Sequence, residues 1–448
     1  GGAGANGLGT NASGGNGAAG ASGGVFATLI SGGTFTVGNW AMTSRTTAGA
    51  GGTGTGTGTA GTNGTASAPA GSGIFVSLTD ATISGSSATL LSDSTIDFSA
   101  SGTGTMALSG DFTATATDTI RFGHASRPAS ATTLSANDIV LTAGGPISAS
   151  GGARLRAAGL FQAESLLGGI SLTDIGSGSD TTLIALNGAI LVSTDLAAAG
   201  LVSVDGTAVT LTSLGDIAFD HATASAGDFT LTARGTARFL GNATGTSISV
   251  NSGDIDMGSG ALLIAANDVA LGSSTTGTTN HIGGADVTGT YSLSAAEIAR
   301  IVARNLSITT PTQTVIGGLT IAAGTGVPIA SDGRLTITSA GRLRVEGAVA
   351  LSGLTPAGGL TLRSTAGIDV VTDSALIDLR NGAGGLGGTL LLESTSVTAA
   401  TQAAIDDMAG AGTPVAIRNS RLGQNDGIVS EEGALRAGSI GITVSQGV

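Results

Sequence analysis

The chain has 448 residues, carries a formal net charge of −13 and contains no cysteine. Charged residues make up 10% of it and aromatic residues 3%, yet 41% is apolar, which excludes an intrinsically disordered chain and a wide aromatic core. An acidic chain without lysine is a poor ligand for nucleic acid, and no apolar run reaches the ~18 residues of a membrane-spanning helix. We therefore expect neither a nucleic-acid partner nor a membrane span.

Residues 1–73 alternate glycine-rich runs with short apolar strands. The runs 1–24 and 48–73 each lead into a predicted strand, and these strands begin at Val25 and Ile74, 49 residues apart. That spacing predicts a repeating unit of one glycine excursion and two or three strands. A flexible linker is the alternative interpretation of the glycine runs. We expect them to be packed, because glycine permits close approach of backbones.

Residues 74–293 form the main predicted solenoid, because short in–out–in apolar strands return at almost constant spacing. Successive strands begin 20, 19, 20, 19 and 21 residues apart, at Ile170, Ile190, Val209, Phe229, Ile248 and Val269. This period is too short for a βαβ unit of about 30 residues and fits one coil of a stacked β-helix. The sequence therefore predicts an all-β, parallel β-helix (β-solenoid), right-handed by the crossover rule.

Two internal repeats support the same interpretation. Gly-Asp-Phe-Thr-Ala-Thr-Ala at residues 110–116 recurs 117 residues later as Gly-Asp-Phe-Thr-Leu-Thr-Ala at 227–233, and the segment 136–141 recurs in similar form at 266–271. Glycine, asparagine and aspartate favour turns, so Gly-Asp or Asn-Asp in front of a strand predicts a corner of the coil.

Residues 294–306 interrupt the pattern. Ser294 and Glu297 have the spacing of a capping box, and Ile298, Ile301 and Val302 fall on one face at helical spacing. We predict one short inserted helix near residues 295–304, lying against the flank of the solenoid. A helix that docks a partner is the alternative interpretation.

Residues 307–448 resume the solenoid with longer coils. Predicted strands at Leu335, Leu360 and Leu390 are 25 and 30 residues apart. A brief helical turn is expected at 401–409 and a corner at 425–427. The last coil stops in the middle of its pattern, so we expect a solenoid truncated at its end and a piece of a larger protein.

The sequence predicts no catalytic, cofactor-binding or metal-ligating residue and no cofactor. The residues weighed for such chemistry are two adjacent acidic pairs and three histidines: Asp406, Asp407, Glu431, Glu432, His124, His221 and His281. The acidic pairs have no histidine nearby, and the histidines follow no ligand spacing. The glycine run 51–58 lacks the strand and helix that flank a nucleotide-binding loop.

Two further sequence patterns are weak indicators of function. Asn-x-Ser/Thr occurs at four positions, as expected by chance in a chain rich in Ser and Thr: Asn11, Asn63, Asn242 and Asn305. Outward threonine pairs, a pattern of ice-binding solenoids, occur in two predicted strands: Thr230 with Thr232, and Thr336 with Thr338. The varying coil length argues against a flat lattice-matching face, and threonine is a good strand residue in any case.

The repeats at residues 227–233 and 358–364 resemble those of filamentous-haemagglutinin-like bacterial exoproteins, and the resemblance extends to autotransporter passenger domains. It covers most of residues 110–448 as a style of repeat. The resemblance implies a large β-helical protein, secreted to the bacterial cell surface, that acts as an adhesin.

We therefore expect an extracellular structural or adhesive β-solenoid that is not an enzyme. It is expected to be a piece of a large secreted surface exoprotein that assembles into a fibre. Self-association would occur end-on or through the glycine runs, and surface glycans or proteins would be further partners. The alternatives left open are a polysaccharide-degrading enzyme on the same scaffold, an ice-binding solenoid and an inert stalk.

Overall fold

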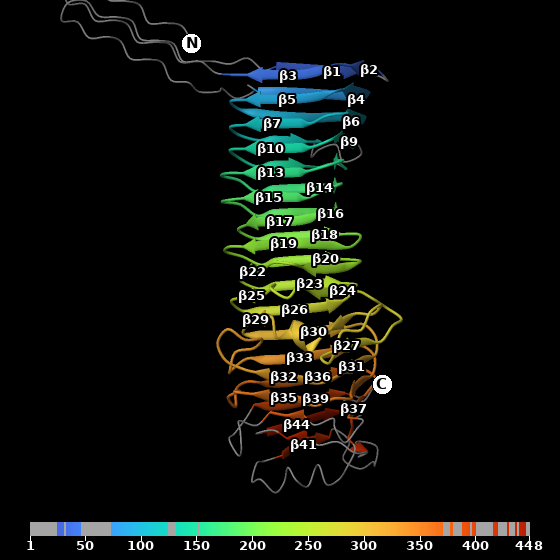
Figure 1. Cartoon of the computed structure of the whole chain (residues 1–448), viewed down its shortest axis with the longest axis vertical. Helices are drawn as coiled ribbons and strands as arrows, with labels where there is room; N and C mark the ends of the chain where they lie inside the picture. Colours follow the sequence, from blue (N-terminus) through green and yellow to red (C-terminus); the bar gives the residue numbers. More distant parts are fainter. Residues whose placement is uncertain are drawn as a thin grey trace, which may run out of the picture. The chain divides into compact units, whose positions relative to one another are not determined.

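The computed structural model describes residues 25–30, 33–45, 73–123, 131–150, 152–370, 377–379, 388–394, 397–399, 415–419, 428–429, 435–436 and 439–444. The chain divides into two compact units, residues 1–207 and 208–448, and each is described by itself. Within each unit the strands are stacked one on another, broadly in chain order (Figure 1). The predicted division of the chain at residues 73, 293 and 306 stays a prediction.

The first unit consists of two parallel sheets that the chain visits in turn, so each coil contributes to both. Sheet 1A contains β1 (Val25–Ile30), β2 (Thr34–Thr36), β4 (Gly73–Gly85), β6 (Thr95–Leu108), β8 (Ile120–Phe122), β9 (Ala131–Ala136), β11 (Ile147–Ala149), β12 (Arg154–Ala157), β14 (Ile170–Ser177) and β16 (Ile190–Ala198). Sheet 1B contains β3 (Asn39–Ser44), β5 (Ser87–Ser92), β7 (Phe112–Ala116), β10 (Ile139–Ala143), β13 (Phe161–Ser165), β15 (Thr181–Ala185) and β17 (Leu201–Gly206).

The strand register in the first unit confirms the predicted spacings. Val25 pairs with Ile74, so the 49-residue unit near the start of the chain is one coil. Ile170 pairs with Ile190, so the period of 20 residues returns the chain to the next rung. The glycine runs themselves lie almost entirely outside the described residues.

The second unit begins with two sheets and continues with three faces per coil. Sheet 2A contains β18 (Val209–Ser213), β20 (Phe229–Ala233), β23 (Ile248–Ser252), β26 (Asp268–Ser273), β30 (Asn305–Thr310), β33 (Arg334–Ser339), β36 (Gly359–Ser364), β39 (Thr389–Ser394), β41 (Val415–Asn419) and β44 (Ser439–Val444). Sheet 2B contains β19 (Ile217–Ala224), β21 (Thr236–Phe239), β22 (Ala243–Gly245), β24 (Asp254–Met257), β25 (Leu263–Ala265) and β29 (Ile301–Val302).

Two smaller sheets complete the later coils of the second unit. Sheet 2C contains β27 (Asn280–Ile282), β28 (Ser292–Leu293), β31 (Thr314–Ile316), β34 (Leu343–Val345), β37 (Ile368–Val370), β40 (Val397–Ala399) and β42 (Ile428–Val429). Sheet 2D contains β32 (Leu319–Ala322), β35 (Val349–Ser352), β38 (Ile377–Asp378) and β43 (Leu435–Arg436). All the described pairings are parallel, which confirms the predicted parallel β-solenoid.

One continuous apolar column runs along sheet 2A. Its rungs pair in register in the order Val209, Phe229, Ile248, Val269, Leu306, Leu335, Leu360 and Leu390. Each of these side chains is buried, and the residue that follows it in the strand mostly faces outward. The alternation of strand side chains thus places one residue of each coil directly on its counterpart in the next.

Each unit also contains one cluster of three buried phenylalanines. In the second unit, Phe219 stacks on its register partner Phe239 at 5.2 Å between ring centroids, and Phe229 contacts both rings edge-on from sheet 2A. In the first unit Phe98, Phe112 and Phe122 repeat this arrangement. Five of these six rings are among the largest fully buried side chains, so aromatic packing in the core is concentrated at these two places.

The inserted helix is confirmed and is shorter than predicted. Helix α1 (Ala295–Ile298) begins with the expected capping box between Ser294 and Glu297 and ends at Ala299. Ile301 and Val302 continue as strand β29, which pairs with β25 of sheet 2B. Pairing with an available strand edge therefore ends the helix after about one turn, since so short a helix has little stability of its own.

Many coil corners carry an Asp or Asn whose side chain accepts the backbone N–H of its own counterpart in the next coil. The O–N distances are 2.7 to 3.1 Å in six such pairs within the described segments: Asp138 with Leu160, Asp180 with Leu201, Asp216 with Thr236, Asp228 with Ser247, Asn242 with Leu262, and Asn305 with Arg334. Asp138, Asp216 and Asp228, which belong to predicted Asn-Asp or Gly-Asp corners, therefore also join consecutive coils.

Candidate functional site

Of the residues weighed from the sequence, the structure describes His221 and His281, which lie in different sheets of the second unit. His221 lies on β19 with its Nδ1 3.3 Å from Oδ2 of the adjacent Asp220, and His281 lies on β27 in register with Val315. His124, both acidic pairs and the glycine run 51–58 lie outside the described residues. Within the described ranges, no group of three or more His, Cys, Asp or Glu side chains is arranged to hold a metal ion.

The other sequence patterns have structural roles. Asn242 and Asn305 use their side-chain oxygens as corner acceptors for the next coil, while Asn11 and Asn63 are outside the described residues. Thr230 pairs in register with Thr210 on an outward position of sheet 2A, and Thr336 pairs with Ser307 in the same sheet.

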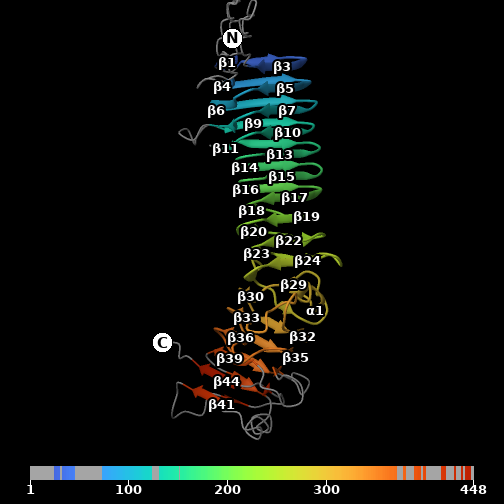
Figure 2. The same ribbon diagram turned by 90° about the vertical axis from the view of Figure 1, so that its left-hand side faces the viewer.

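A cluster of buried and half-buried polar groups lies where residues 274–304 leave the regular coil. This insertion separates β26 from β30 and contains β27, β28, α1 and β29. Figure 2 shows α1 at the flank of the second unit, beside β29. We call the place where the insertion meets β24 the insertion junction, which consists of Asp254, Met257, Tyr291, Glu297 and Arg300.

Side chains of the insertion replace a missing strand at this junction. In the described structure β24 pairs only with β21, so its other edge has no strand partner. Glu297 Oε1 accepts the backbone N–H of Met257 at 3.0 Å, and Arg300 Nη1 donates to the carbonyl oxygen of Met257 at 2.5 Å and of Gly258 at 3.1 Å. The carboxylate and guanidinium thus satisfy an N–H and a C=O that a neighbouring rung would otherwise pair.

Both carboxylate oxygens of Glu297 accept hydrogen bonds from neighbouring residues. Its second oxygen, Oε2, accepts both the N–H and the hydroxyl of Ser294 at 2.8 Å, which closes the capping box. Glu297 is 6% exposed. Because both of its oxygens accept hydrogen bonds in a buried setting, this carboxylate serves as an anchor between α1 and β24.

Asp254 contributes the second carboxyl group of the junction. Its Oδ1 accepts the N–H of Ser292 on β28 and that of Ile255, both at 2.9 Å. Partial burial raises the pKa of Asp254 to about 6, and the negative charges of Asp286 and Glu297 act in the same direction, while the two backbone hydrogen bonds oppose them.

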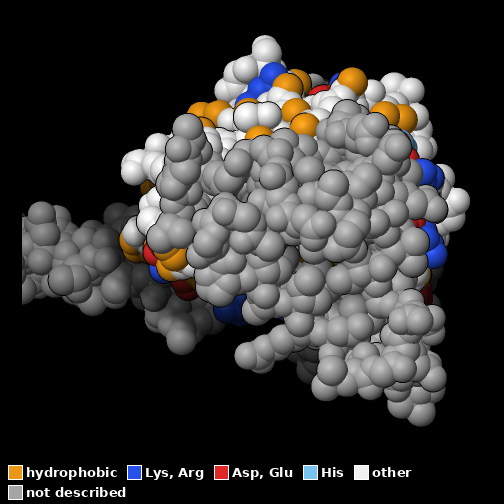
Figure 3. Space-filling view, turned by 90° about the horizontal axis from the view of Figure 1, so that it is seen from below, with side chains coloured by type: hydrophobic (Ala, Val, Ile, Leu, Met, Phe, Trp, Pro, Cys, Tyr) orange, Lys and Arg blue, Asp and Glu red, His pale blue; other side chains and the backbone are white. Residues whose placement is uncertain are grey.

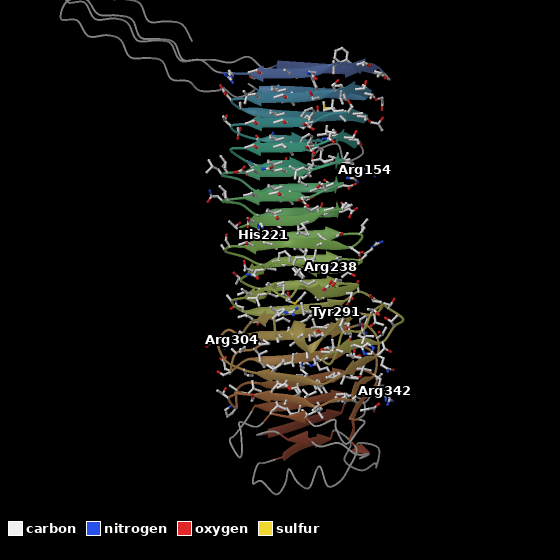
Figure 4. The ribbon with its side chains drawn as sticks, viewed as in Figure 1. Arg154, His221, Arg238, Tyr291, Arg304 and Arg342 are labelled. Carbon is white, nitrogen blue, oxygen red and sulfur yellow. The ribbon has the colours of Figure 1, made fainter. Side chains whose placement is uncertain are left out.

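Tyr291, next to β28, is the single tyrosine of the chain and is completely buried. Its phenolic oxygen has no hydrogen-bond partner among the residues that the structure describes. Burial raises the pKa of Tyr291 well above its usual value, and the charges of Asp254 and Glu297 add to that effect. Figure 4 places Tyr291 among the strands of the second unit, level with the insertion.

The outer surface carries ion pairs that span neighbouring coils. Five of them are Arg156 with Asp174, Arg238 with Asp256, Arg304 with Asp332, Arg342 with Asp369, and Arg363 with Glu393. Figure 4 shows Arg304 and Arg342 on opposite sides of the second unit, and Figure 3 shows basic and acidic side chains next to each other on the rim of the described surface. Each such exposed pair contributes about 0–1 kcal/mol.

The sequence revealed only part of the junction. The capping box identified Ser294 and Glu297, but nothing local links Glu297 to Met257, 40 residues earlier. The available signals for the rest were the Gly-Asp corner at Asp254 and the lone tyrosine.

Comparisons with family models, curated proteins and solved structures found no significant match to the chain. Among the described helices, none has the length and apolar character needed to cross a membrane.

Proposed function

We propose that the protein is an extracellular structural or adhesive β-solenoid, a piece of a large secreted bacterial surface exoprotein that assembles into a fibre. The resemblance of its repeats to filamentous-haemagglutinin-like exoproteins and autotransporter passengers supports this assignment. Its partners are further copies of the same chain and surface glycans or proteins. The polysaccharide-degrading enzyme and the ice-binding solenoid are the competing assignments.

One observation carries the proposal: polar side chains repeatedly tie each coil to the next. Asp138, just before β10, accepts the backbone N–H of Leu160, just before β13. At the end of β13, the hydroxyl of Ser165 donates to the carbonyl oxygen of Gly145 at 2.8 Å. Together with the backbone ladders and the ion pairs, these contacts build a support whose strength is distributed along its length. Such a support suits a structural task better than it suits catalysis in a single pocket.

Localisation and assembly are tested together. Antibodies raised against residues 152–370 should label intact source cells, and the same antigen should be recovered from the culture medium or the cell surface. The purified chain should form linear assemblies in negative-stain electron micrographs, and its sedimentation coefficient should increase with protein concentration. Antigen found only inside lysed cells, together with a concentration-independent monomer, would overturn the proposal.

A separate assay tests the alternative that the protein is a polysaccharide-degrading enzyme. The chain is incubated with a panel of neutral and acidic polysaccharides, and newly formed reducing ends and unsaturated products are measured. We expect binding to immobilised surface glycans without product release. Sustained turnover that a single substitution such as Asp256→Asn abolishes would replace the structural assignment by an enzymatic one.

A further inference from the structure

Six successive strands of sheet 2A present two outward rows of small, uncharged side chains. In β18, β20, β23, β26, β30 and β33 these positions alternate with buried residues, and they pair in register from one rung to the next. All of them are half-buried or exposed. We call this surface the hydroxyl face: Thr210, Thr212, Thr230, Thr232, Ser249, Asn251, Ala270, Gly272, Ser307, Thr309, Thr336 and Thr338.

The hydroxyl face stays in register although the coils behind it differ in length. The coil from Val209 to Phe229 spans 20 residues and the one from Val269 to Leu306 spans 37, yet both pairs are register partners. The additional residues of the longer coil belong to the insertion 274–304, and Figure 2 shows helix α1 on the side of the second unit away from β30. The varying coil length, which argued against a regular outer face, therefore leaves this one undisturbed.

The hydroxyl face carries no charge, whereas its edges do. Asp228 precedes β20, Arg234 follows it, and both side chains are exposed. The alternation of outward and buried residues continues through both positions, so they lie on the same side of the strand as Thr230 and Thr232. An uncharged centre inside a charged rim is the usual anatomy of a protein interface.

A second copy of the chain is the partner that this face fits. Two chains of net charge −13 repel each other, so they approach most easily through a surface without carboxylates. Six rungs about 4.8 Å apart, each about five residues of ~3.3 Å long, give a face on the order of 500 Å². Two copies would together bury about 1,000 Å², the lower limit of a specific interface, and small side chains allow two sheets to pack face to face.

We propose that two copies of the chain pack on each other through the hydroxyl face, so that their second units lie side by side. This inference rests on the proposed assembly into a fibre and names the surface through which the copies meet laterally. A two-fold axis parallel to the stack of coils places β20 opposite β20 of the other copy, with its direction reversed. Asp228 then lies opposite the partner subunit's Arg234, and Arg234 opposite the partner subunit's Asp228, which makes the face complementary to itself.

A glutamate in the centre of the hydroxyl face should separate the two copies. Ser249 is exposed and its register neighbours Thr230 and Ala270 are uncharged, so Ser249→Glu places one carboxylate from each copy in the interface. We expect the dissociation constant of the lateral pair to rise at least about tenfold in analytical ultracentrifugation. In scanning transmission electron microscopy, the mass per unit length of the fibres should fall from that of two chains to that of one.

The matched control is Ser203→Glu, which makes the same change at an outward position of sheet 1B. It should leave both the dissociation constant and the mass per unit length unchanged. Circular dichroism of both variants confirms that the coils remain folded.

The predicted ion pairs provide a second test that leaves the face itself intact. Arg234→Asp brings a carboxylate opposite the partner subunit's Asp228, so pairing should weaken at low ionic strength and much less in ~1 M salt. Adding Asp228→Asn to Arg234→Asp removes that repulsion and should restore part of the affinity. Asparagine keeps a side-chain oxygen for the N–H of Ser247, so the corner bond is preserved.

The outcomes separate lateral pairing from the proposed fibre. Wild-type fibres with the mass per unit length of one chain, or fibres that Ser249→Glu leaves unchanged, would overturn lateral pairing and leave the fibre standing. Pairs that Ser249→Glu dissociates but that never grow into fibres would support lateral pairing and contradict the fibre. A monomer whose hydroxyl face binds a neutral polysaccharide instead, with binding lost in Ser249→Glu, would also overturn lateral pairing. Should Ser249→Glu unfold, an unchanged affinity in Arg234→Asp at low ionic strength would do so.

Discussion

The carboxylate of Asp180 accepts a 2.8 Å hydrogen bond from the backbone N–H of Leu201, the residue at the same corner of the following coil. Asp180 and Leu201 immediately precede Thr181 and Val202, which pair in register. The bond therefore joins two equivalent positions one rung apart. The same relationship links Asp138 to Leu160 and Asp216 to Thr236, so a coil corner serves both as a turn and as an acceptor for its successor.

Removal of the corner carboxylate should weaken the coil stack. Asp180→Ala leaves the N–H of Leu201 without its partner, and because the site is exposed and water can replace the acceptor, we expect a loss of about 1 kcal/mol. Asp180→Asn keeps a side-chain oxygen and should lose less. Urea denaturation followed by circular dichroism measures both. Equal losses in the two variants would show that the acceptor role of Asp180 does not stabilise the fold.

The glycine that faces this corner should be intolerant of a side chain. A Cβ at Gly200 would lie 2.3 Å from Oδ1 of Asp180 and 2.8 Å from its backbone nitrogen, so Gly200→Ala forces the two coils apart. We expect a loss of about 1–3 kcal/mol in urea denaturation. Gly38→Ala is the matched control, because a Cβ there meets no atom within 4 Å. A Gly200→Ala variant as stable as Gly38→Ala would contradict the close packing of these corners.

The phenylalanine clusters should contribute strongly to stability. Phe229→Ala empties a fully buried position beside the stacked rings of Phe219 and Phe239 and should cost about 3–5 kcal/mol. Phe35 is 49% exposed, so Phe35→Ala should change stability by less than about 0.5 kcal/mol. Thermal or chemical denaturation compares the two variants. A small effect of Phe229→Ala would show that the core of the second unit is loosely packed at this level.

Tyr291 should resist ionisation in the native protein. Its pKa is raised by burial, so absorbance at about 295 nm should stay flat as the pH passes 10, the ordinary pKa of tyrosine. Because the folded state holds this proton more tightly, the stabilisation is complete below pH ~10 and is lost as the pH rises further. The same titration in guanidinium chloride should show an ordinary midpoint. A native midpoint near 10 would mean that the phenol is accessible to water.

The sequence alone determined the parts of this protein that depend on local periodicity. The returning apolar triplets predicted that Ile170 pairs with Ile190 and Val209 with Phe229, because a strand with alternating faces buries one shared column only if equivalent residues are stacked. The Gly-Asp and Asn-Asp pairs marked the corners, and the capping box marked the first residue of α1.

Only the tertiary structure decided which contacts these residues make with other coils. The role of Asp180 as an acceptor for Leu201 depends on the register of two coils, and the end of α1 depends on the free edge of β25 that β29 joins. The insertion junction is the clearest case, because Asp254 and Ser292 are 38 residues apart and meet only when β24 lacks a neighbouring strand. Burial and neighbouring charge then shift the pKa of Asp254, and neither quantity is encoded in any short stretch of sequence.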